Sequence, residues 1–362
     1  MNRVLPIVTF LLLTTGFFNT SAADDRYTTG DLRPALAAGA LHPAGELPHS
    51  ADDLRHGSCE LPPAGSPRQM LFGDPYILLH EGTYYMYGTS AEDGIEVYRS
   101  DDLQHWEGPV GARDGLALHK DDVWGDHWFW APEVYAIEGR FYMFFSAEEH
   151  ILAAVSDSPL GPFVQEEQAP MLETKAIDNH LFFDDDGTPY IYFVNFNNGL
   201  SVWVAEMNED LLTMKPETRK ECIRPQQAWE MKEGSVNEGP YVMKHEGRYY
   251  LFYSGNGYTS QEYGVGFAVA DNPMGPWKKY DKNPILQSPD TLRGVGHGAF
   301  FKDKAGALNY VYHAHNSMEK IHPRKVYINR CEFVKEEDVS YPVLRMLPPR
   351  QTPLLRAAGG SR

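Results

Sequence analysis

The stretch FGDPYILLHEGTYYMYGTS at residues 72–90 has the form of a β-hairpin, and that form recurs along the chain. A strand-like run begins at the acidic residue Asp74, turns at Gly82 and returns as a second strand rich in aromatic residues. Four further stretches share this order, and the turn glycines of the five are Gly82, Gly139, Gly187, Gly247 and Gly306. Their separations of 57, 48, 60 and 59 residues indicate a structural repeat.

A third strand-like segment follows each hairpin, as in GIEVYRSDDLQHW at residues 94–106 and GVGFAVADNPMGPW at residues 264–277. Units of three clear strands and a weaker fourth, repeated at this period, are typical of propeller blades. We therefore predict an all-β fold, a five-bladed β-propeller over residues 68–335. A β-sandwich would not explain five units with the same internal order.

The two ends of the chain differ from this repeat. Residues 1–23 have the pattern of a secretory signal peptide, with Arg3 before an apolar stretch and small residues at 21–23. The stretch is short and interrupted for a retained membrane anchor, which is the alternative. Residues 24–67 are predicted to be an N-terminal extension or linker, and residues 336–362 a C-terminal tail. The expected location is secreted or periplasmic.

Composition excludes some partners. The formal net charge is -18, so no basic patch is available to neutralise phosphates, and no nucleic-acid partner is expected. No membrane partner is expected either. Cys59, Cys222 and Cys331 are too few and too scattered for a disulfide framework or a zinc site, and whether any two of them pair stays open.

Three acidic residues stand at the starts of first strands: Asp74, Asp178 and Glu238. The first strands of propeller blades line the central channel, so their starts share one rim. Glu133 and His297 begin the first strands of the other two units. We expect all five side chains to surround one mouth of the channel.

Each acid taken alone is compatible with a structural role, for example Asp74 before a proline in a turn. Gathered at one rim, carboxyl groups raise the pKa of one another. That arrangement suits chemistry in which one acid is protonated and another is ionised at the same pH. Hydrolysis of a glycosidic bond is such a reaction.

The motifs FGDPYIL, FWAPEVY, AIDNHLFFDDDG, NEGPYVM and GVGHGAFF together resemble those of glycoside hydrolase family 43. The resemblance covers the whole predicted propeller. It implies a five-bladed propeller enzyme that inverts the anomeric centre, with Asp74 as general base, Glu238 as general acid and Asp178 as the residue that adjusts the pKa of the acid. Asn179 departs from the small residue or proline that many members have there.

Four residues are predicted to bind substrate: Trp130, His297, Arg324 and Asn237. Sugars present C–H faces that stack on aromatic rings, and Trp130 is in register with the rim, although core packing would also explain it. Arg324 is predicted to reach an acid or a sugar hydroxyl, with a surface arginine as the alternative. Weaker candidates of the same kind are Trp124, Trp128 and Tyr258.

No cofactor is expected to be required. The resemblance implies that His297 lies in the central channel, near the substrate or, in some members, near a water-coordinated calcium ion, so a structural calcium there is kept as an alternative. The acidic run at residues 184–187 is predicted to be a hairpin turn rather than an ion loop, because Asp-Gly favours turns and the EF-hand pattern is absent.

The predicted function is a secreted, inverting glycoside hydrolase that cleaves pentosyl or furanosyl linkages in oligo- or polysaccharides. The resemblance implies an α-L-arabinofuranosidase or β-xylosidase, with a galactofuranosidase as a further option. A non-catalytic glycan-binding propeller is disfavoured because all three acids are present. A retaining enzyme would need carboxyls about 5–5.5 Å apart, against about 6.5–9.5 Å for inversion. A phosphorylase would need basic residues at the rim, where the sequence has no Lys/Arg cluster.

Overall fold

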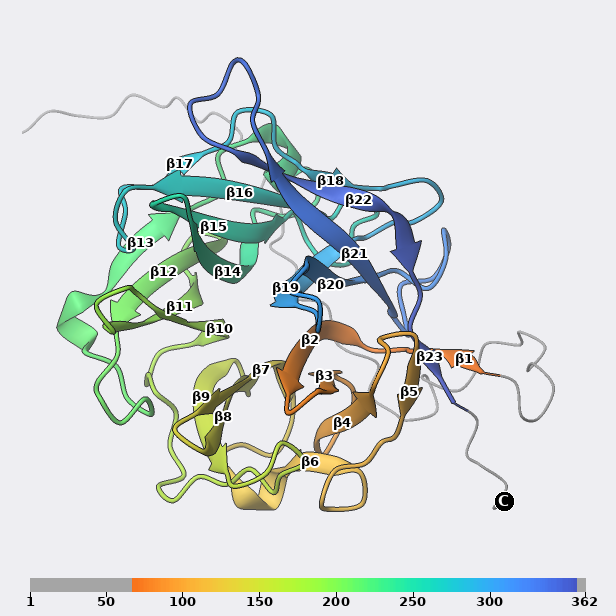
Figure 1. Ribbon diagram of the computed structural model, residues 1–362. Helices are drawn as coiled ribbons and strands as arrows, with labels where there is room; N and C mark the ends of the chain where they lie inside the picture. Colours follow the sequence, from red (N-terminus) through yellow and green to blue (C-terminus); the bar gives the residue numbers. More distant parts are fainter. Residues whose placement is uncertain (1–66, 357–362) are drawn as a thin grey trace, which may run out of the picture. The chain divides into compact units, whose positions relative to one another are not determined.

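The computed structural model describes residues 67–356 (Figure 1). The leader, Cys59 and nearly all of the predicted extension lie outside this range. Cys222 and Cys331 are free thiols, the second of them buried. No helix in the described part of the chain is long and apolar enough to cross a membrane. Short 3-10 turns are present at η1 (Lys120–Asp122), η2 (Pro216–Thr218) and η3 (Ala228–Met231).

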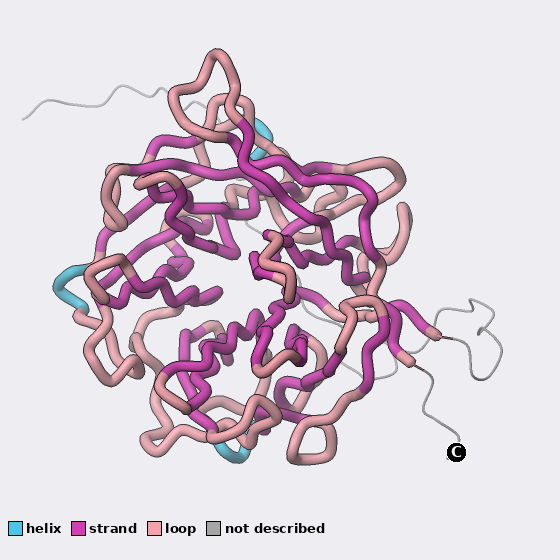
Figure 2. The backbone as a smooth tube through the Cα atoms, in the orientation of Figure 1, coloured by secondary structure: helices cyan, strands magenta, loops and turns pink. Residues whose placement is uncertain are grey.

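The strands form sheets arranged radially around an axis, which confirms the predicted all-β propeller (Figures 1 and 2). The innermost strands are β2 (Gly73–His80), β7 (Trp130–Ile137), β10 (Ala176–Phe183), β14 (Asn237–His245) and β19 (Gly296–Lys302). Their hairpin partners are β3 (Thr83–Thr89), β8 (Arg140–Ala147), β11 (Pro189–Phe196), β15 (Arg248–Gly255) and β20 (Leu308–Ala314). The third strands are β4 (Gly94–Ser100), β9 (His150–Ser156), β12 (Leu200–Glu206), β16 (Gly264–Ala270) and β21 (Lys325–Val334).

Outer strands complete the sheets unevenly. They are β5 (His105–Glu107), β6 (Leu116–His119), β13 (Lys220–Ile223), β17 (Lys278–Lys279), β18 (Leu286–Gln287) and β22 (Val343–Gln351). The strands β1 (Arg68–Gln69) and β23 (Leu354–Leu355) pair with each other, and β23 also runs parallel to β5. The segment predicted as a tail therefore supplies β22 to the last sheet and β23 to the first.

The predicted count of five blades needs a correction in the first sheet. The described strands group into five connected sheets, but this sheet branches at β4, which pairs with β5 at one end and with β6 at the other. Counted as a unit of its own, the β4–β6 ladder brings the number to six. The sequence repeat predicts the inner three strands of each unit, but it does not indicate with which strand a short outer strand pairs.

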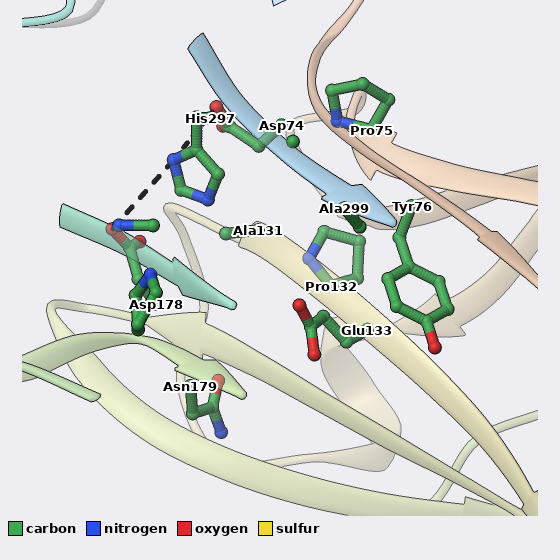
Figure 3. Close-up of a pocket in the computed structure, with 13 residues that line it drawn as sticks. Asp74, Pro75, Tyr76, Ala131, Pro132, Glu133, Asp178, Asn179, His297 and Ala299 are labelled. Atoms are coloured by element: carbon green, nitrogen blue, oxygen red, sulfur yellow. Dashed lines mark hydrogen bonds and ion pairs between the residues drawn. The ribbon is translucent and has the colours of Figure 1, made fainter. Parts of the chain in front are cut away.

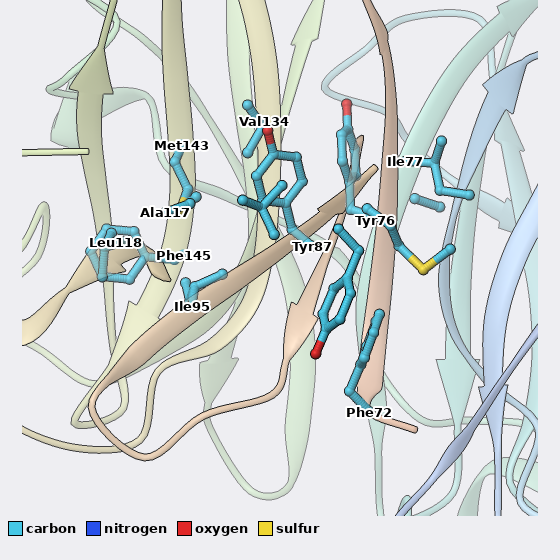
Figure 4. Close-up of a cluster of buried hydrophobic side chains, with 14 of the residues drawn as sticks. Phe72, Tyr76, Ile77, Tyr87, Ile95, Ala117, Leu118, Val134, Met143 and Phe145 are labelled. Atoms are coloured by element: carbon cyan, nitrogen blue, oxygen red, sulfur yellow. The ribbon is translucent and has the colours of Figure 1, made fainter. Parts of the chain in front are cut away.

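Both faces of the inner strands are buried between neighbouring sheets. Tyr87, Ile95, Leu118, Val134 and Phe145 belong to one such apolar cluster, shared by the first and second sheets (Figure 4). All seven residues of β16 are buried. Side chains packed at crystal-like density resist displacement, so these walls hold the strand starts in fixed positions.

Each innermost strand has a register shift just after its start. The residues with positive φ in these shifts are Asp74 (53°), Ala131 (44°), Asp178 (57°), Gly239 (56°) and His297 (37°). Such backbone conformations cost roughly 1–2 kcal/mol for residues other than glycine, and bulges of this kind re-aim side chains. Asp74, Asp178 and His297 therefore occupy equivalent positions, whereas Glu238 precedes its bulge residue by one position and Glu133 follows its own by two.

Candidate active site

Asp74 is a buried carboxylate held by cationic and hydroxyl partners. Arg324 donates hydrogen bonds of 2.8 and 3.2 Å to its two oxygens, and the hydroxyl of Thr89 donates one of 2.6 Å. Burial by itself would raise the pKa of Asp74, but Arg324, His297 and His313 outweigh it and hold that pKa well below the usual value. Asp74 is therefore ionised at neutral pH, as a general base must be.

Arg324 reaches the rim because the opposing strand has no side chain at Gly73. A Cβ on Gly73 would lie 1.9 Å from the Cζ atom of Arg324. The guanidinium also lies over the ring of Tyr258, with 5.3 Å between Cζ and the ring centre. Arg324 is 7% exposed, so the alternative of a surface arginine is wrong.

We expect Gly73→Ala to disturb Asp74 without touching it. The added methyl group displaces the guanidinium, and the loss of that positive charge raises the pKa of Asp74. The acidic limb of the kcat/KM profile should then move to higher pH. Gly111→Ala, a glycine substitution crowded by the backbone of Leu116 in an outer loop, is the control for packing alone. An unmoved acidic limb in Gly73→Ala would contradict this role of Arg324.

Asp178 links the third and fourth innermost strands. Its backbone N–H donates to the hydroxyl of Ser146 at 3.0 Å, and its Oδ2 accepts the N–H of Gly239 at 3.0 Å. Burial raises its pKa, His297 opposes that shift and Asp74 adds to it. Asp178 thus ties down the backbone directly after Glu238.

The pKa of Glu238 is raised, whereas the pKa of Asp74 is lowered. Burial and the charge of Asp178 raise its pKa to about 7, against the opposing effects of His297 and Tyr263. The Tyr263 hydroxyl donates a hydrogen bond of 2.6 Å to Oε1. Tyr263 fits there because a Cβ on Gly296 would lie 2.4 Å from its ring. A carboxyl group with this pKa is protonated below about pH 7 and can then donate its proton.

His297 lies between the carboxylates (Figure 3). Its Nδ1 is 3.4 Å from Oδ1 of Asp74 and 3.9 Å from Oδ2 of Asp178. Burial would lower its pKa, but Asp74, Asp178 and Glu238 together raise it. The ring therefore tends to be protonated, and its positive charge reduces the repulsion between the carboxyl groups of Asp74 and Asp178.

His313 and Glu133 have contacts that the sequence did not predict. His313 is fully buried and accepts the N–H of Asp74 at 3.2 Å. Burial, followed by the charge of Arg324, lowers its pKa to about 3, so it is a neutral acceptor. Glu133 lines the same channel as Asp74 and Asp178, but its Oε2 lies 2.9 Å from Nδ1 of His180.

The central channel itself is narrow. Its walls include Asp74, Asp178, His297 and Glu133 but not Glu238 (Figure 3). The enclosed volume is about 10 Å³, enough for about one water molecule. This space is too small for a sugar ring.

Trp130 occupies in the second sheet the ladder position that Glu238 occupies in the fourth, since each pairs with a serine just before the bulge. Its ring stacks on that of Trp128, with ring centres 5.5 Å apart and planes 18° apart. Trp128 is 37% exposed. The two rings form an aromatic surface at the rim. Trp130 is also packed against one apolar core cluster, as the alternative expected, and Trp124 is packed against another.

Asn237 lies behind the acid rather than at the mouth. It is fully buried, its Oδ1 accepts a hydrogen bond of 2.7 Å from Lys279, and its Nδ2 donates one of 2.8 Å to the carbonyl of Val236. Both amide atoms are thus occupied, which corrects the predicted substrate contact. Because Asn237 precedes Glu238 in the sequence, it was expected near the acid, but the sequence does not indicate the direction of its side chain.

The donor set around His297 does not suit direct calcium ligation. Calcium takes 6–8 oxygen ligands, whereas both oxygens of Asp74 already accept hydrogen bonds from Arg324. Oδ2 of Asp178 is likewise occupied by Gly239. No chemical step is therefore assigned to a metal. Asp184, in the acidic run, accepts hydrogen bonds from Lys244 and Tyr249, as expected for a structural turn.

An ionised carboxylate and a protonated carboxyl, buried at one rim of a propeller, define the acid–base class of glycoside hydrolases. Residues 69–338 match the model of the glycosyl hydrolases family 43, and the chain belongs to this family. It is thus an inverting glycoside hydrolase, as the resemblance implied.

Relatives and solved structures agree with this assignment. The chain is 28% identical to the β-D-galactofuranosidase xynD of Aspergillus niger, over 67% of the chain and 73% of that protein. It is 29% identical to an extracellular exo-α-(1→5)-L-arabinofuranosidase of Streptomyces chartreusis, over 80% and 91%. A crystal structure of an endo-1,4-β-xylanase from Bacteroides thetaiotaomicron has 44% identity and a TM-score of 0.75, over 81% of this chain and 99% of that one.

Proposed function

We propose that this enzyme cleaves pentosyl or furanosyl linkages of oligo- or polysaccharides, as an α-L-arabinofuranosidase or β-xylosidase. The observation that carries the proposal is the opposite displacement of two pKa values, low at Asp74 and about 7 at Glu238. Relatives named for arabinofuranosidase and xylosidase activity support the substrate class. Residues 1–23 direct export of the enzyme.

In this proposal Glu238 protonates the leaving oxygen while Asp74 removes a proton from water on the opposite face of the sugar. Asp178 helps to keep Glu238 protonated through its charge. Trp128 and Trp130 supply a surface for sugar stacking. The chemistry needs no cofactor. A galactofuranosidase is the second candidate, favoured by the similarity to the Aspergillus niger enzyme.

The test is a screen of 4-nitrophenyl α-L-arabinofuranoside, β-D-xyloside and β-D-galactofuranoside, followed by proton NMR of the best substrate. We expect turnover of a pentoside and first appearance of the inverted anomer, because an activated water attacks opposite the leaving group. First appearance of the retained anomer would remove Asp74 from its role as base. Glycan binding without turnover would indicate a non-catalytic propeller.

The pH profile follows from the same two groups. Glu238 is protonated below its pKa of about 7 and ionised above it, and only the protonated form can act as the acid. We therefore expect kcat/KM on poorly activated glycosides to fall about tenfold per pH unit above roughly pH 7. The acidic limb, set by Asp74, should lie below the usual carboxyl range. An alkaline limb near pH 5 would contradict the assignment of Glu238.

A further inference from the structure

A buried ion pair stands directly behind the strand that carries Glu238. Glu230 on η3 is fully buried, and the side chain of Lys279 on β17 is 8% exposed. The Nζ atom of Lys279 lies 2.6 and 2.7 Å from the two carboxylate oxygens of Glu230. Such a pair is costly to desolvate and gives little net stability compared with apolar residues of similar size. Its position therefore calls for a reason other than stability.

The pair is fully connected to its surroundings. Glu230 also accepts hydrogen bonds from the backbone N–H groups of Gln226 and Gln227 and from the hydroxyl of Tyr253. Lys279 spans the sheet from the outer strand, passing 5.0 Å from the ring centre of Tyr253, and donates to Oδ1 of Asn237 at 2.7 Å. Buried polar networks in which every member has its partners are rigid.

The contact with Asn237 completes a series of three consecutive attachments at the start of β14. Lys279 holds Asn237, Tyr263 holds Glu238, and Asp178 holds the N–H of Gly239. The last two attachments belong to the acids and their hydrogen bonds. The first comes from residues that reach neither the channel nor the mouth.

The charge of the pair matters as well as its geometry. A lone ammonium beside the strand start would favour the ionised form of Glu238, which cannot donate a proton. The carboxylate of Glu230 cancels that charge. We propose that the Lys279–Glu230 pair is a positioning device for the general acid, which fixes Asn237 and the strand start while adding no net charge. This inference rests on the proposed function, since it requires Glu238 to be the acid.

The test compares a phenyl glycoside with a 2,4-dinitrophenyl glycoside of the sugar selected by the screen. Glu230→Gln combined with Lys279→Met removes both charges together, so no buried charge is left alone. We expect kcat on the phenyl glycoside to fall about ten- to hundredfold, because a misplaced acid transfers its proton poorly. The dinitrophenyl glycoside needs no acid, so its kcat should change less than twofold, with KM unchanged for both.

Asn237→Ala should reproduce this selective loss, and adding it to the double variant should cause little further loss if Lys279 acts through Asn237. The matched control is Lys244→Met with Asp184→Asn, which removes a second lysine–carboxylate pair at the far end of the same strand. It should leave the ratio of the two rates as in the wild type.

Equal losses on both substrates, or independent losses from Asn237→Ala and the double variant, would overturn the inference. If the double variant does not fold, Asn237→Ala decides by the same ratio. Glu238→Gln separates the two levels of the argument. If Glu238→Gln loses more activity on the phenyl than on the dinitrophenyl glycoside, but the positioning variants do not, only the positioning role is refuted. If Glu238→Gln loses equal activity on both substrates, the proposed function and this inference are refuted together.

Discussion

Glu238→Gln is expected to abolish most turnover of natural oligosaccharides while sparing activated substrates. Natural linkages release basic alkoxides, which need a proton as the bond breaks, whereas dinitrophenyl glycosides release stable phenolates. Loss of a general acid typically costs about 10²–10⁴ in rate. We expect a loss of this size on arabino- or xylo-oligosaccharides and a much smaller one on the dinitrophenyl glycoside, measured as kcat at pH 6.

The amide is a suitable probe, because it keeps the shape of Glu238 and can still accept the hydrogen bond from Tyr263. Glu246→Gln is the control for a change of charge, since Glu246 is exposed at the hairpin turn of the same strand. Equal losses on both substrate types would assign Glu238 to binding or folding. Persistence of the alkaline limb in Glu238→Gln would assign that limb to another group.

The sequence predicted the propeller and the three acids because both depend on a local pattern that repeats. The order of strand, turn and aromatic strand identifies the inner hairpins, and the strand starts then meet at one rim. Asp74, Asp178 and Trp130 could be placed from this register alone. Glu133 does line the channel, but its contact with His180 could not be predicted, because side chains alternate with a period of two and each bulge adds an offset.

Apart from Arg324, which was expected to reach an acid or a sugar hydroxyl, the partners of the acids could not be predicted, because they come from other strands and meet only in the assembled ring. Tyr263 and Arg324 each occupy space left by a glycine on a different strand, Gly296 and Gly73. A glycine at the strand start was the available signal, but it names no partner. His313 lies in YVYHAH, where nothing in the local pattern separates a core histidine from one that accepts the N–H of Asp74.

The contacts of Asn237 could not be predicted from the sequence either. Its neighbour Glu238 suggested a place at the substrate, yet the side chain turns to Lys279, which comes from an outer strand 42 residues further along the chain. Lys278 and Lys279 look alike in sequence, but only the second is buried against Glu230. Sequence neighbours were thus a better guide to the strand than to the direction of its side chains.

Asp74→Asn is expected to lower turnover of both natural and activated substrates by about 10²–10⁴, in contrast to Glu238→Gln. Water must be activated whatever the leaving group, and an amide cannot take its proton. The substitution also leaves Arg324 buried without its carboxylate, and breaking such a pair costs about 3–5 kcal/mol of stability. Rates should therefore be measured well below the melting temperature of the variant, with circular dichroism confirming that it is folded.

Asp157→Asn, at a highly exposed aspartate, removes the same charge and should leave kcat unchanged. The decisive comparison is the loss on the dinitrophenyl glycoside, which only the base variant should show. If folded Asp74→Asn hydrolyses that substrate at a near-normal rate, Asp74 is not the base. Its contacts with Arg324, Thr89 and His313 would then serve to organise the rim, and the group that activates water would have to be sought among the other carboxyls, of which Asp178 lies beside the same His297.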